Sequence, residues 1–237
     1  MDDLSAIVFD FDGLLMDTES TLVEGWRAAW EFYGLELELD QGFWPGDGGD
    51  CTEHRLDRLA TVVGPSFDRL ACQSRYDAYR RQMHASMDFC PGIRQWLAEA
   101  RALGLRCAVA SSSPLSWVGE HLSRVGAFEW FDVVATGDEV PAPKPDPGVY
   151  LLALARLGVP GRRAVAVEDT PHGIEAAATA GMATVAIPNV FVDPTRVTAA
   201  DLVLRSAAES SLTDVLNRLA GPTTPRPQMG PSVPTVA

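Results

Sequence analysis

The sequence predicts an α/β protein in which helices cover both faces of a parallel sheet and an all-helical segment follows the first strand. Short apolar runs alternate with helix-length amphipathic stretches along most of the chain, and this alternation is typical of parallel sheets. Residues 18–88 break the rhythm, because they contain helical patterns and no convincing strand. We therefore expect an α/β core formed by residues 1–17 and 89–220 and a helical cap formed by residues 18–88.

The predicted strands are short runs that are β-branched or continuously apolar, a pattern typical of buried parallel strands. In chain order they are Ala6–Asp12, Cys107–Ser111, Asp132–Ala135, Ala164–Val167, Thr184–Ile187 and Leu202–Leu204. The predicted core helices have apolar residues at three- and four-residue spacing, with proline near their starts and glycine just beyond their ends. They span Ile93–Ala102, Leu115–Val125, Gly148–Leu157 and Gly173–Ala180.

The cap is predicted to contain three amphipathic helices, Leu22–Tyr33, His54–Val63 and Phe67–Met83. The turn-forming loop Phe43–Asp50 interrupts them. Such an insertion is expected to lie over the carboxyl edge of the sheet. Residues 221–237 are rich in proline and nearly free of charge, so we expect a disordered tail there.

Composition and charge exclude several classes of protein. Of the 237 residues, 46% are hydrophobic and 22% charged, as in ordinary globular proteins. The formal net charge of −13 disfavours nucleic acid and anionic membranes as partners. The chain lacks a signal-peptide pattern, an apolar run long enough to span a membrane and any Cys-x-x-Cys pair. We therefore expect a soluble, monomeric protein of the reducing cytoplasm.

Acidic side chains follow two of the predicted strands. Asp10 and Asp12 end the first strand, and Glu168 and Asp169 end the fourth. Because ligands of parallel sheets bind beyond the carboxyl ends of the strands, we expect these carboxylates to lie near one another. A buried carboxylate is costly without a compensating charge, and neighbouring carboxylates repel. Hard oxygen ligands of this kind suit Mg²⁺.

Hydroxyl groups and one lysine are predicted at the same edge. Ser111, Ser112 and Ser113 end the second strand just before a helix, where hydroxyls and free backbone N–H groups suit an oxyanion. Serines in this place are also ordinary helix caps. Lys144 lies in a loop with proline at every second position, which stiffens the loop and holds the cation in place. A phosphate beside a metal ion would satisfy both groups.

Four motifs, in this order along the chain, carry a resemblance to a known family. They are Asp10–Glu19 (DFDGLLMDTE), Val109–Ser113 (VASSS), Lys144–Pro147 (KPDP) and Val167–Gly173 (VEDTPHG). The sequence resembles the haloacid dehalogenase superfamily, in the phosphatase and β-phosphoglucomutase-like branch with a helical cap after the first strand. The resemblance extends to about Ala220 and implies a Rossmann-like core.

The resemblance also implies a role for each matching residue. Asp10 would attack phosphorus and become an aspartyl-phosphate, which divides one difficult hydrolysis into two steps. Asp12 would protonate the leaving oxygen and later take a proton from water. The phosphoryl oxygens would be held by Ser111, Ser112 and Lys144. Mg²⁺ would be held by Asp10, the backbone carbonyl of Asp12 and Asp169, with Glu168 supporting Lys144 or a metal-bound water.

Three places in the sequence indicate which activity of the family to expect. Asp12 argues against a dehalogenase, because those relatives lack this aspartate. Leu22 stands where the sugar phosphomutases have a histidine, and the acidic segment 47–50 replaces their cap arginine, with Arg55 the nearest arginine but outside the motif position. We expect a Mg²⁺-dependent phosphatase for a small, singly phosphorylated metabolite such as a sugar phosphate. The alternatives are a sugar phosphomutase and a non-catalytic phosphometabolite-binding protein.

The aromatic residues and histidines outside the predicted site are expected to have no part in catalysis. Trp26 and Trp44 are expected to pack in the core of the cap rather than on a sugar. The histidines His54, His84 and His121 are expected on solvent-facing helix surfaces, and His172, at a helix start near the site, has no assigned role.

Overall fold

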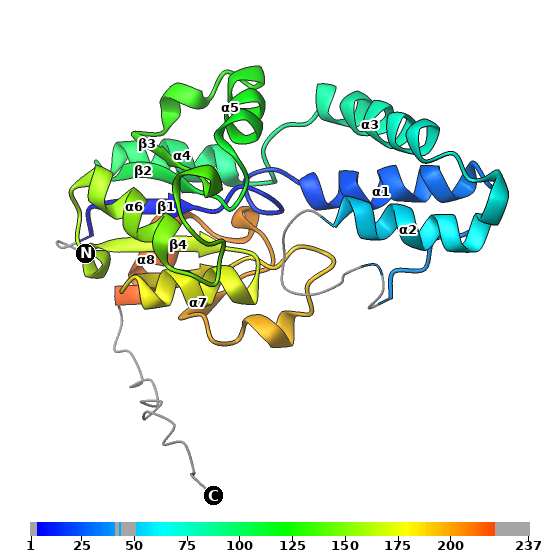
Figure 1. Cartoon of the computed structure of the whole chain (residues 1–237). Helices are drawn as coiled ribbons and strands as arrows, with labels where there is room; N and C mark the ends of the chain where they lie inside the picture. Colours follow the sequence, from blue (N-terminus) through cyan, green and yellow to red (C-terminus); the bar gives the residue numbers. More distant parts are fainter. Residues whose placement is uncertain (1–3, 41–42, 44–50, 221–237) are drawn as a thin grey trace, which may run out of the picture.

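The core is a six-stranded parallel sheet in the order β3-β2-β1-β4-β5-β6 (Figure 1). The computed structural model describes residues 4–40, 43 and 51–220. Its strands are β1 (Ala6–Phe9), β2 (Arg106–Ala110), β3 (Val133–Ala135), β4 (Ala164–Glu168), β5 (Ala183–Ala186) and β6 (Leu202–Val203). The predicted fold class is therefore confirmed. Within the described residues, none of the helices has the length and apolarity to span a bilayer.

Helices pack on both faces of this sheet. One face is covered by α4 (Ile93–Ala102), α5 (Leu115–Arg124) and α8 (Leu212–Ala220), and the other by α6 (Gly148–Leu157) and α7 (Pro171–Thr179). Because side chains alternate along a strand, Ile7 and Phe9 of β1 enter the first layer while Ala6 and Val8 enter the second. Helix α8 has no counterpart among the helices predicted from the sequence.

A separate group of helices lies beyond the carboxyl end of the sheet (Figure 1). It contains α1 (Thr18–Glu31), α2 (Thr52–Val63) and α3 (Arg69–Ala85), and it has its own apolar cluster, which includes the fully buried Trp26. Helix α1 begins before the predicted Leu22, because the Asp17 carboxylate caps it by accepting from the Ser20 N–H at 3.1 Å. The domain boundaries at residues 17 and 88 stay a prediction. Trp44, segment 47–50 and residues 221–237 lie outside the described residues.

Strand β1 is shorter than the sequence predicts, since it ends at Phe9 rather than Asp12. The Asp10 N–H still donates to the Val167 carbonyl at 2.9 Å, after which the chain turns at Gly13, whose φ is +79°. The sheet neighbours of β1 are β2 and β4, and the chain crosses to opposite sides of β1 to reach them. Ligands of open parallel sheets bind where the strand order reverses in this way.

Candidate active site

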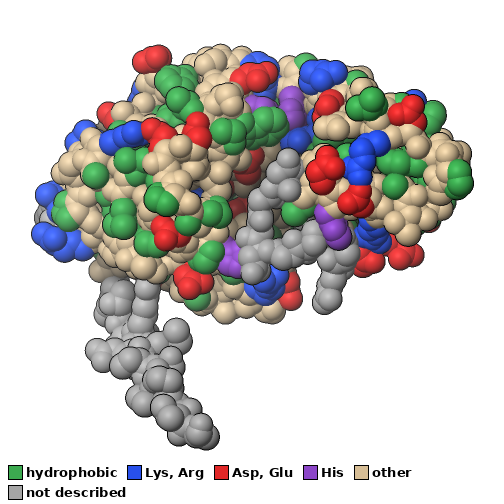
Figure 2. Space-filling model, viewed as in Figure 1, with side chains coloured by type: hydrophobic (Ala, Val, Ile, Leu, Met, Phe, Trp, Pro, Cys, Tyr) green, Lys and Arg blue, Asp and Glu red, His purple; other side chains and the backbone are tan. Residues whose placement is uncertain are grey.

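A pocket of about 1290 Å³ lies between the carboxyl edge of the sheet and the helices α1 and α3. Figure 2 shows this hollow, with acidic side chains inside it. Its lining includes Asp10, Asp12, Ser111, Ser112, Lys144 and Asp169. The topology therefore brings together residues from the ends of β1, β2 and β4, as the strand-end argument expected, together with the lysine loop.

Lys144 is at the centre of a buried ionic cluster. Its Nζ donates to Asp10 Oδ1 at 2.5 Å, to Glu168 Oε1 at 2.6 Å and to the Ala110 carbonyl at 2.9 Å. The Tyr150 hydroxyl donates to the same Glu168 oxygen at 2.6 Å. Burial lowers the pKa of Lys144, but the carboxylates of Asp10 and Glu168 raise it more, so it stays above the ordinary value. The lysine is therefore a permanent cation against Asp10.

Lys144 by itself does not offset the charge that Asp10, Glu168 and Asp169 would carry if all three were ionised. Burial raises the pKa of Asp10 to about 8, with Lys144 opposing the rise and Glu168 adding to it. Burial, and then Asp10 and Glu168, raise the pKa of Asp169 well above its ordinary value. Groups with such raised pKa values are stabilised as anions by an added cation.

The donor set fits a divalent cation. One oxygen each of Asp10, Glu168 and Asp169 lies within 4.8 Å of the others. Both Glu168 oxygens already have donors, since Oε1 accepts from Lys144 and Tyr150 and Oε2 accepts from the Asp169 N–H at 3.1 Å. Asp10 and Asp169 thus remain as ligands, a pattern that suits Mg²⁺, which commonly takes one or two carboxylates and completes its shell with water and phosphate.

Gly13 makes room for this arrangement. A Cβ atom at Gly13 would collide with the Asp169 carboxylate and lie 2.9 Å from Asn189 Nδ2. Asn189 in turn donates to Asp169 Oδ2 at 2.7 Å, which orients the carboxylate. The glycine is therefore needed both for its positive φ and for the approach of Asp169 to the β1 turn.

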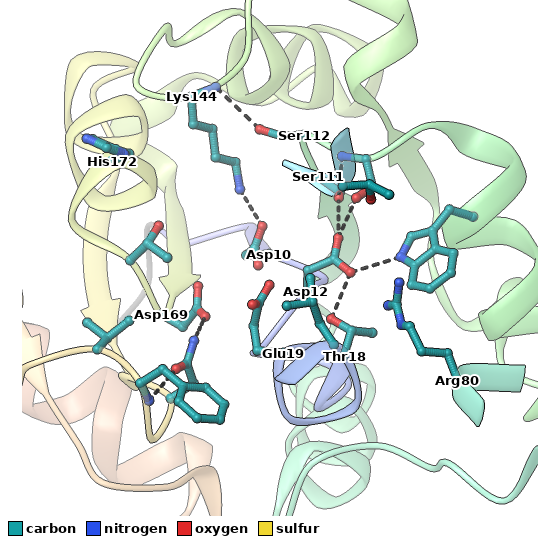
Figure 3. A pocket seen from close by; sticks show the side chains of 18 of the residues that line it. Asp10, Asp12, Thr18, Glu19, Arg80, Ser111, Ser112, Lys144, Asp169 and His172 are labelled. Carbon is teal, nitrogen blue, oxygen red and sulfur yellow. Dashed lines mark hydrogen bonds and ion pairs between the residues drawn. The ribbon is translucent and has the colours of Figure 1, made fainter. Parts of the chain in front are cut away.

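The Asp12 side chain faces a different set of partners. Its Oδ1 accepts from Thr18 Oγ1 at 2.8 Å and from Trp117 Nε1 at 2.9 Å. Its Oδ2 accepts from Ser113 Oγ at 2.6 Å and from Ser111 Oγ at 3.4 Å. Figure 3 shows the carboxylate pointing toward Thr18 and Ser111 rather than toward Asp169. Any part of Asp12 in metal binding would fall to its backbone carbonyl, which stays a prediction.

The two predicted phosphate-binding serines occupy different positions. Ser111 is buried, and its Oγ accepts from the Ser113 N–H at 3.0 Å. Ser112 is exposed, and its Oγ accepts from the backbone N–H of Lys144 at 3.3 Å, which ties the lysine loop to the end of β2 (Figure 3). Their proposed contacts with phosphate stay predictions.

The sequence-based site omitted five residues that hold its carboxylates. Thr18 and Ser113 lie inside the motifs, and Asn189 follows the end of β5 at the same sheet edge, so an extended strand-end search would have found all three. Trp117 and Tyr150 lie on helices outside every motif. Nothing in the sequence shows which face of those helices meets the site.

The expectation that His84 and His121 face solvent is wrong, whereas His54 is exposed as expected. His84 Nε2 lies 2.8 Å from Thr21 Oγ1, and His84 Nδ1 lies 3.3 Å from His121 Nε2. Helix α3 meets α5 here, so each helix covers a face that would otherwise be exposed. Burial is the main reason that the pKa of His84 falls to about 4 and that the pKa of His121 is also lowered.

Two arginines line the pocket, Arg80 of α3 and Arg196, whereas Arg55 does not. Arg55 is buried, with its Nε donating to the Phe43 carbonyl at 3.2 Å. Arg80 lines the pocket, and its Nη1 donates to the Tyr76 hydroxyl at 3.1 Å. Its Nε has no hydrogen-bond partner within the described part of the chain. Nearby Glu19 has a pKa raised to about 6 by burial first and by Asp12 second.

Comparison with known proteins places the chain in a family. The model of the haloacid dehalogenase-like hydrolases matches residues 7–187. YhcW of Bacillus subtilis is 35% identical over 91% of this chain and 98% of its own length. A phosphorylated carbohydrates phosphatase of Thermotoga maritima is 31% identical, covering 76% of this chain and 82% of that protein.

A solved structure supports the same placement. The crystal structure of CbbY from Rhodobacter sphaeroides in complex with phosphate has a TM-score of 0.67 and 31% sequence identity, covering 89% of this chain and 98% of that one. These likenesses extend over both the sheet and the helical insertion. The chain therefore belongs to the haloacid dehalogenase-like hydrolases and is an enzyme of their phosphatase branch.

Proposed function

We propose that this protein is a Mg²⁺-dependent phosphomonoester hydrolase that acts on a small phosphorylated carbohydrate through an aspartyl-phosphate at Asp10. The observation that carries the proposal is the placement of Asp10, which lies at the end of β1 between Lys144 and the Asp169 carboxylate. A nucleophilic carboxylate needs positive charge beside it when it approaches a phosphate dianion, and here Lys144 supplies it, together with a cation that Asp10 and Asp169 would hold. A relative that acts on phosphorylated carbohydrates supports the substrate class.

In the first half-reaction, an Asp10 oxygen attacks phosphorus as the bond between phosphorus and the leaving oxygen breaks. The electron pair of that bond goes to the leaving oxygen, which takes a proton from Asp12. Lys144 and the hydroxyl of Ser111 hold the phosphoryl oxygens. Mg²⁺, when bound at Asp10 and Asp169, neutralises charge on the transferring group. The alcohol leaves, and phosphate stays on Asp10.

In the second half-reaction, water attacks the phosphorus of the aspartyl-phosphate. Asp12, now a carboxylate, accepts a proton from this water, and the bond between phosphorus and the Asp10 oxygen breaks. Inorganic phosphate leaves and both carboxyl groups return to their starting states. Thr18 and Ser113 donate to the Asp12 carboxylate and hold it in place for this step.

The pocket wall contributed by α1 and α3 supports a polyhydroxylated leaving group. It presents a carboxylate at Glu19, an amide at Gln73, a hydroxyl at Tyr76 and a guanidinium at Arg80. Mixed donors and acceptors of this kind match the hydroxyl groups of a sugar or polyol better than an apolar group. The expected monomeric state and cytoplasmic location stay predictions of the sequence.

A sugar phosphomutase is the second candidate, and Arg80 is the observation that favours it. A guanidinium that lines the pocket offers a charged donor to a second phosphate. Leu22, which replaces the mutase histidine, also lines the pocket and opposes this candidate. Incubation with glucose 1-phosphate separates the two, since glucose 6-phosphate is the mutase product whereas glucose and inorganic phosphate are the phosphatase products.

A phosphate-release assay tests the main proposal. The panel contains glucose 6-phosphate, fructose 6-phosphate, sorbitol 6-phosphate, glucose 1-phosphate and p-nitrophenyl phosphate, each with Mg²⁺ and with a chelator. We expect release from at least one sugar or polyol phosphate with Mg²⁺, none with the chelator, and loss of release in Asp10→Asn. Release that persists in Asp10→Asn or without divalent cations would contradict the mechanism.

A further inference from the structure

Trp117 gives Asp12 a hydrogen-bond donor that lies outside the four motifs. The residue lies in the first turn of α5, and its indole Nε1 donates to Asp12 Oδ1 at 2.9 Å. The other donors, Thr18, Ser111 and Ser113, are all hydroxyl groups within the motifs. A hydroxyl can rotate its proton toward another acceptor, whereas the indole N–H direction is fixed by the ring.

The donors around Asp12 determine which way its carboxyl group faces. Each oxygen accepts from two side chains, with Thr18 and Trp117 on Oδ1 and Ser111 and Ser113 on Oδ2. Rotation of the carboxyl group would break contacts on both oxygens together. Proton transfer to a leaving oxygen requires hydrogen-bond geometry, so the efficiency of Asp12 depends on this orientation.

The indole ring is itself held between the cap helix α3 and the core. From α3, the Arg80 guanidinium carbon lies 5.1 Å from the ring centroid of Trp117, and the His84 ring lies 5.2 Å from it. From α5, the His121 ring lies 4.1 Å away, and its Nδ1 is 2.9 Å from the Trp117 carbonyl. Figure 3 shows Arg80 reaching toward the site beside Asp12. Packing on two sides thus limits the motion of the N–H donor.

We propose that Trp117 is a positioning residue for Asp12, which orients the carboxyl group toward the leaving oxygen and links its position to the seating of α3 on the core. The inference rests on the proposed function, because it needs Asp12 to act on a leaving group. Trp117 exchanges no proton itself. The proton passes from Asp12 to the leaving oxygen, and the indole N–H keeps its hydrogen throughout.

Two substrates with different leaving groups distinguish this role from a structural one. An alcohol leaves poorly without a proton, whereas p-nitrophenolate leaves readily as an anion. The ratio kcat/KM reports steps up to the first irreversible one, which includes departure of the leaving group. For Trp117→Phe we expect kcat/KM to fall about 10- to 100-fold with the best sugar phosphate of the panel. With p-nitrophenyl phosphate the fall should be below about threefold.

Trp96→Phe is the matched control. The Trp96 Nε1 also donates to an oxygen at 2.9 Å, but that oxygen is the Ser210 carbonyl in the core, away from the pocket. We expect this variant to change kcat/KM by less than about threefold with the sugar phosphate and with p-nitrophenyl phosphate. Circular dichroism checks the fold of each variant. If Trp117→Phe does not fold, Trp117→Met serves instead, because its flexible thioether fills the gap without a donor.

A second measurement repeats Trp117→Phe in the Asp12→Asn background. If Trp117 acts through Asp12, the residual activity of Asp12→Asn should not fall further. An equal fall with both substrates, no fall with either, or a full additional fall in the Asp12→Asn background would each overturn the inference. Wild-type protein that releases no phosphate from any substrate would instead overturn the proposed function.

Discussion

Asp10 and Asp12 are two residues apart in one turn, yet their surroundings differ in kind. Asp10 faces a buried cluster of charged groups, with Lys144 against it and Glu168 and Asp169 close by. Asp12 faces neutral donors, which are three hydroxyl groups and an indole. Paired carboxylates can take different chemical roles when their environments differ in this way. The surroundings of Asp10, called the charged side below, suit covalent attack near a cation. The surroundings of Asp12, called the neutral side, suit proton transfer.

Removal of Lys144 should disrupt the charged side most severely. Lys144→Gln leaves Asp10 and Glu168 buried without their cation, so we expect a loss of about 3–5 kcal/mol in the free energy of unfolding. Phosphate release should fall at least about 10²-fold. Urea denaturation and the release assay measure the two effects.

The control for Lys144→Gln is Arg156→Gln, which breaks an exposed ion pair with Glu139. That change should cost less than about 1 kcal/mol. If the two variants lost equal stability, the buried ion pairs of Lys144 would contribute no more to the free energy of unfolding than an exposed ion pair does.

Alanine at Gly13, compared with alanine at Gly34, should distinguish an effect on metal binding from the effect of backbone strain. Gly13→Ala and Gly34→Ala both place a side chain at positive φ, at +79° and +71°, which costs about 1–2 kcal/mol each. Only at Gly13 does the added Cβ meet Asp169, since nothing lies within 4 Å of it at Gly34. We expect the Mg²⁺ concentration for half-maximal activity to rise about tenfold or more in Gly13→Ala alone. Equal Mg²⁺ requirements in the two variants would count against Asp169 as a ligand.

Tyr150 tests whether Glu168 supports Lys144 or binds the metal. Tyr150→Phe removes the hydroxyl that donates to Glu168 Oε1, which should cost about 1.5–3 kcal/mol in urea denaturation. Because Glu168 is fully engaged with protein donors, the Mg²⁺ requirement should change less than about threefold. A large rise in that requirement would make Glu168 a metal ligand. The exposed Tyr79→Phe is the control for stability.

His84, which packs against Trp117 on the side of Asp12, predicts a dependence of the free energy of unfolding on pH. The folded pKa of His84, about 4, lies below the ordinary value of 6.5. Between these values the unfolded chain binds more protons, so stability should fall as the pH drops from 6.5 to 4. We expect this group to contribute a loss of about 2 kcal/mol between pH 7 and pH 4.5.

Urea denaturation of wild type and His84→Gln at several pH values gives the free energy of unfolding against pH. The difference between the two slopes measures the contribution of His84. Burial is the first cause of the lowered pKa, followed by Arg80 and then His121, so both sides of the junction between α3 and α5 take part. His54→Gln, at an exposed position, should leave the slope unchanged. A steeper slope in His84→Gln than in wild type would show that the sign is wrong.

Much of the fold could be predicted because its signals are local. The bounds of α4 and α6 agree with the sequence prediction, since apolar spacing and the residues that end a helix act over a few neighbouring positions. The sequence predicts too long a strand β1, because apolar and acidic residues alternate as far as Asp12, whereas β1 ends at Phe9. Local patterns of this kind do not show where a strand stops pairing.

The sequence alone determined that Asp10, Ser111 and Asp169 meet at one edge, because the strand ends of a parallel sheet share an edge and each of these residues lies at or just after the end of a strand. Only the tertiary structure decided how those residues are partnered. The indole of Trp117 reaches Asp12 from α5, and the contact between His84 and His121 arises where α3 meets α5. Both contacts depend on the packing of elements far apart in the chain, which no periodicity within one helix encodes.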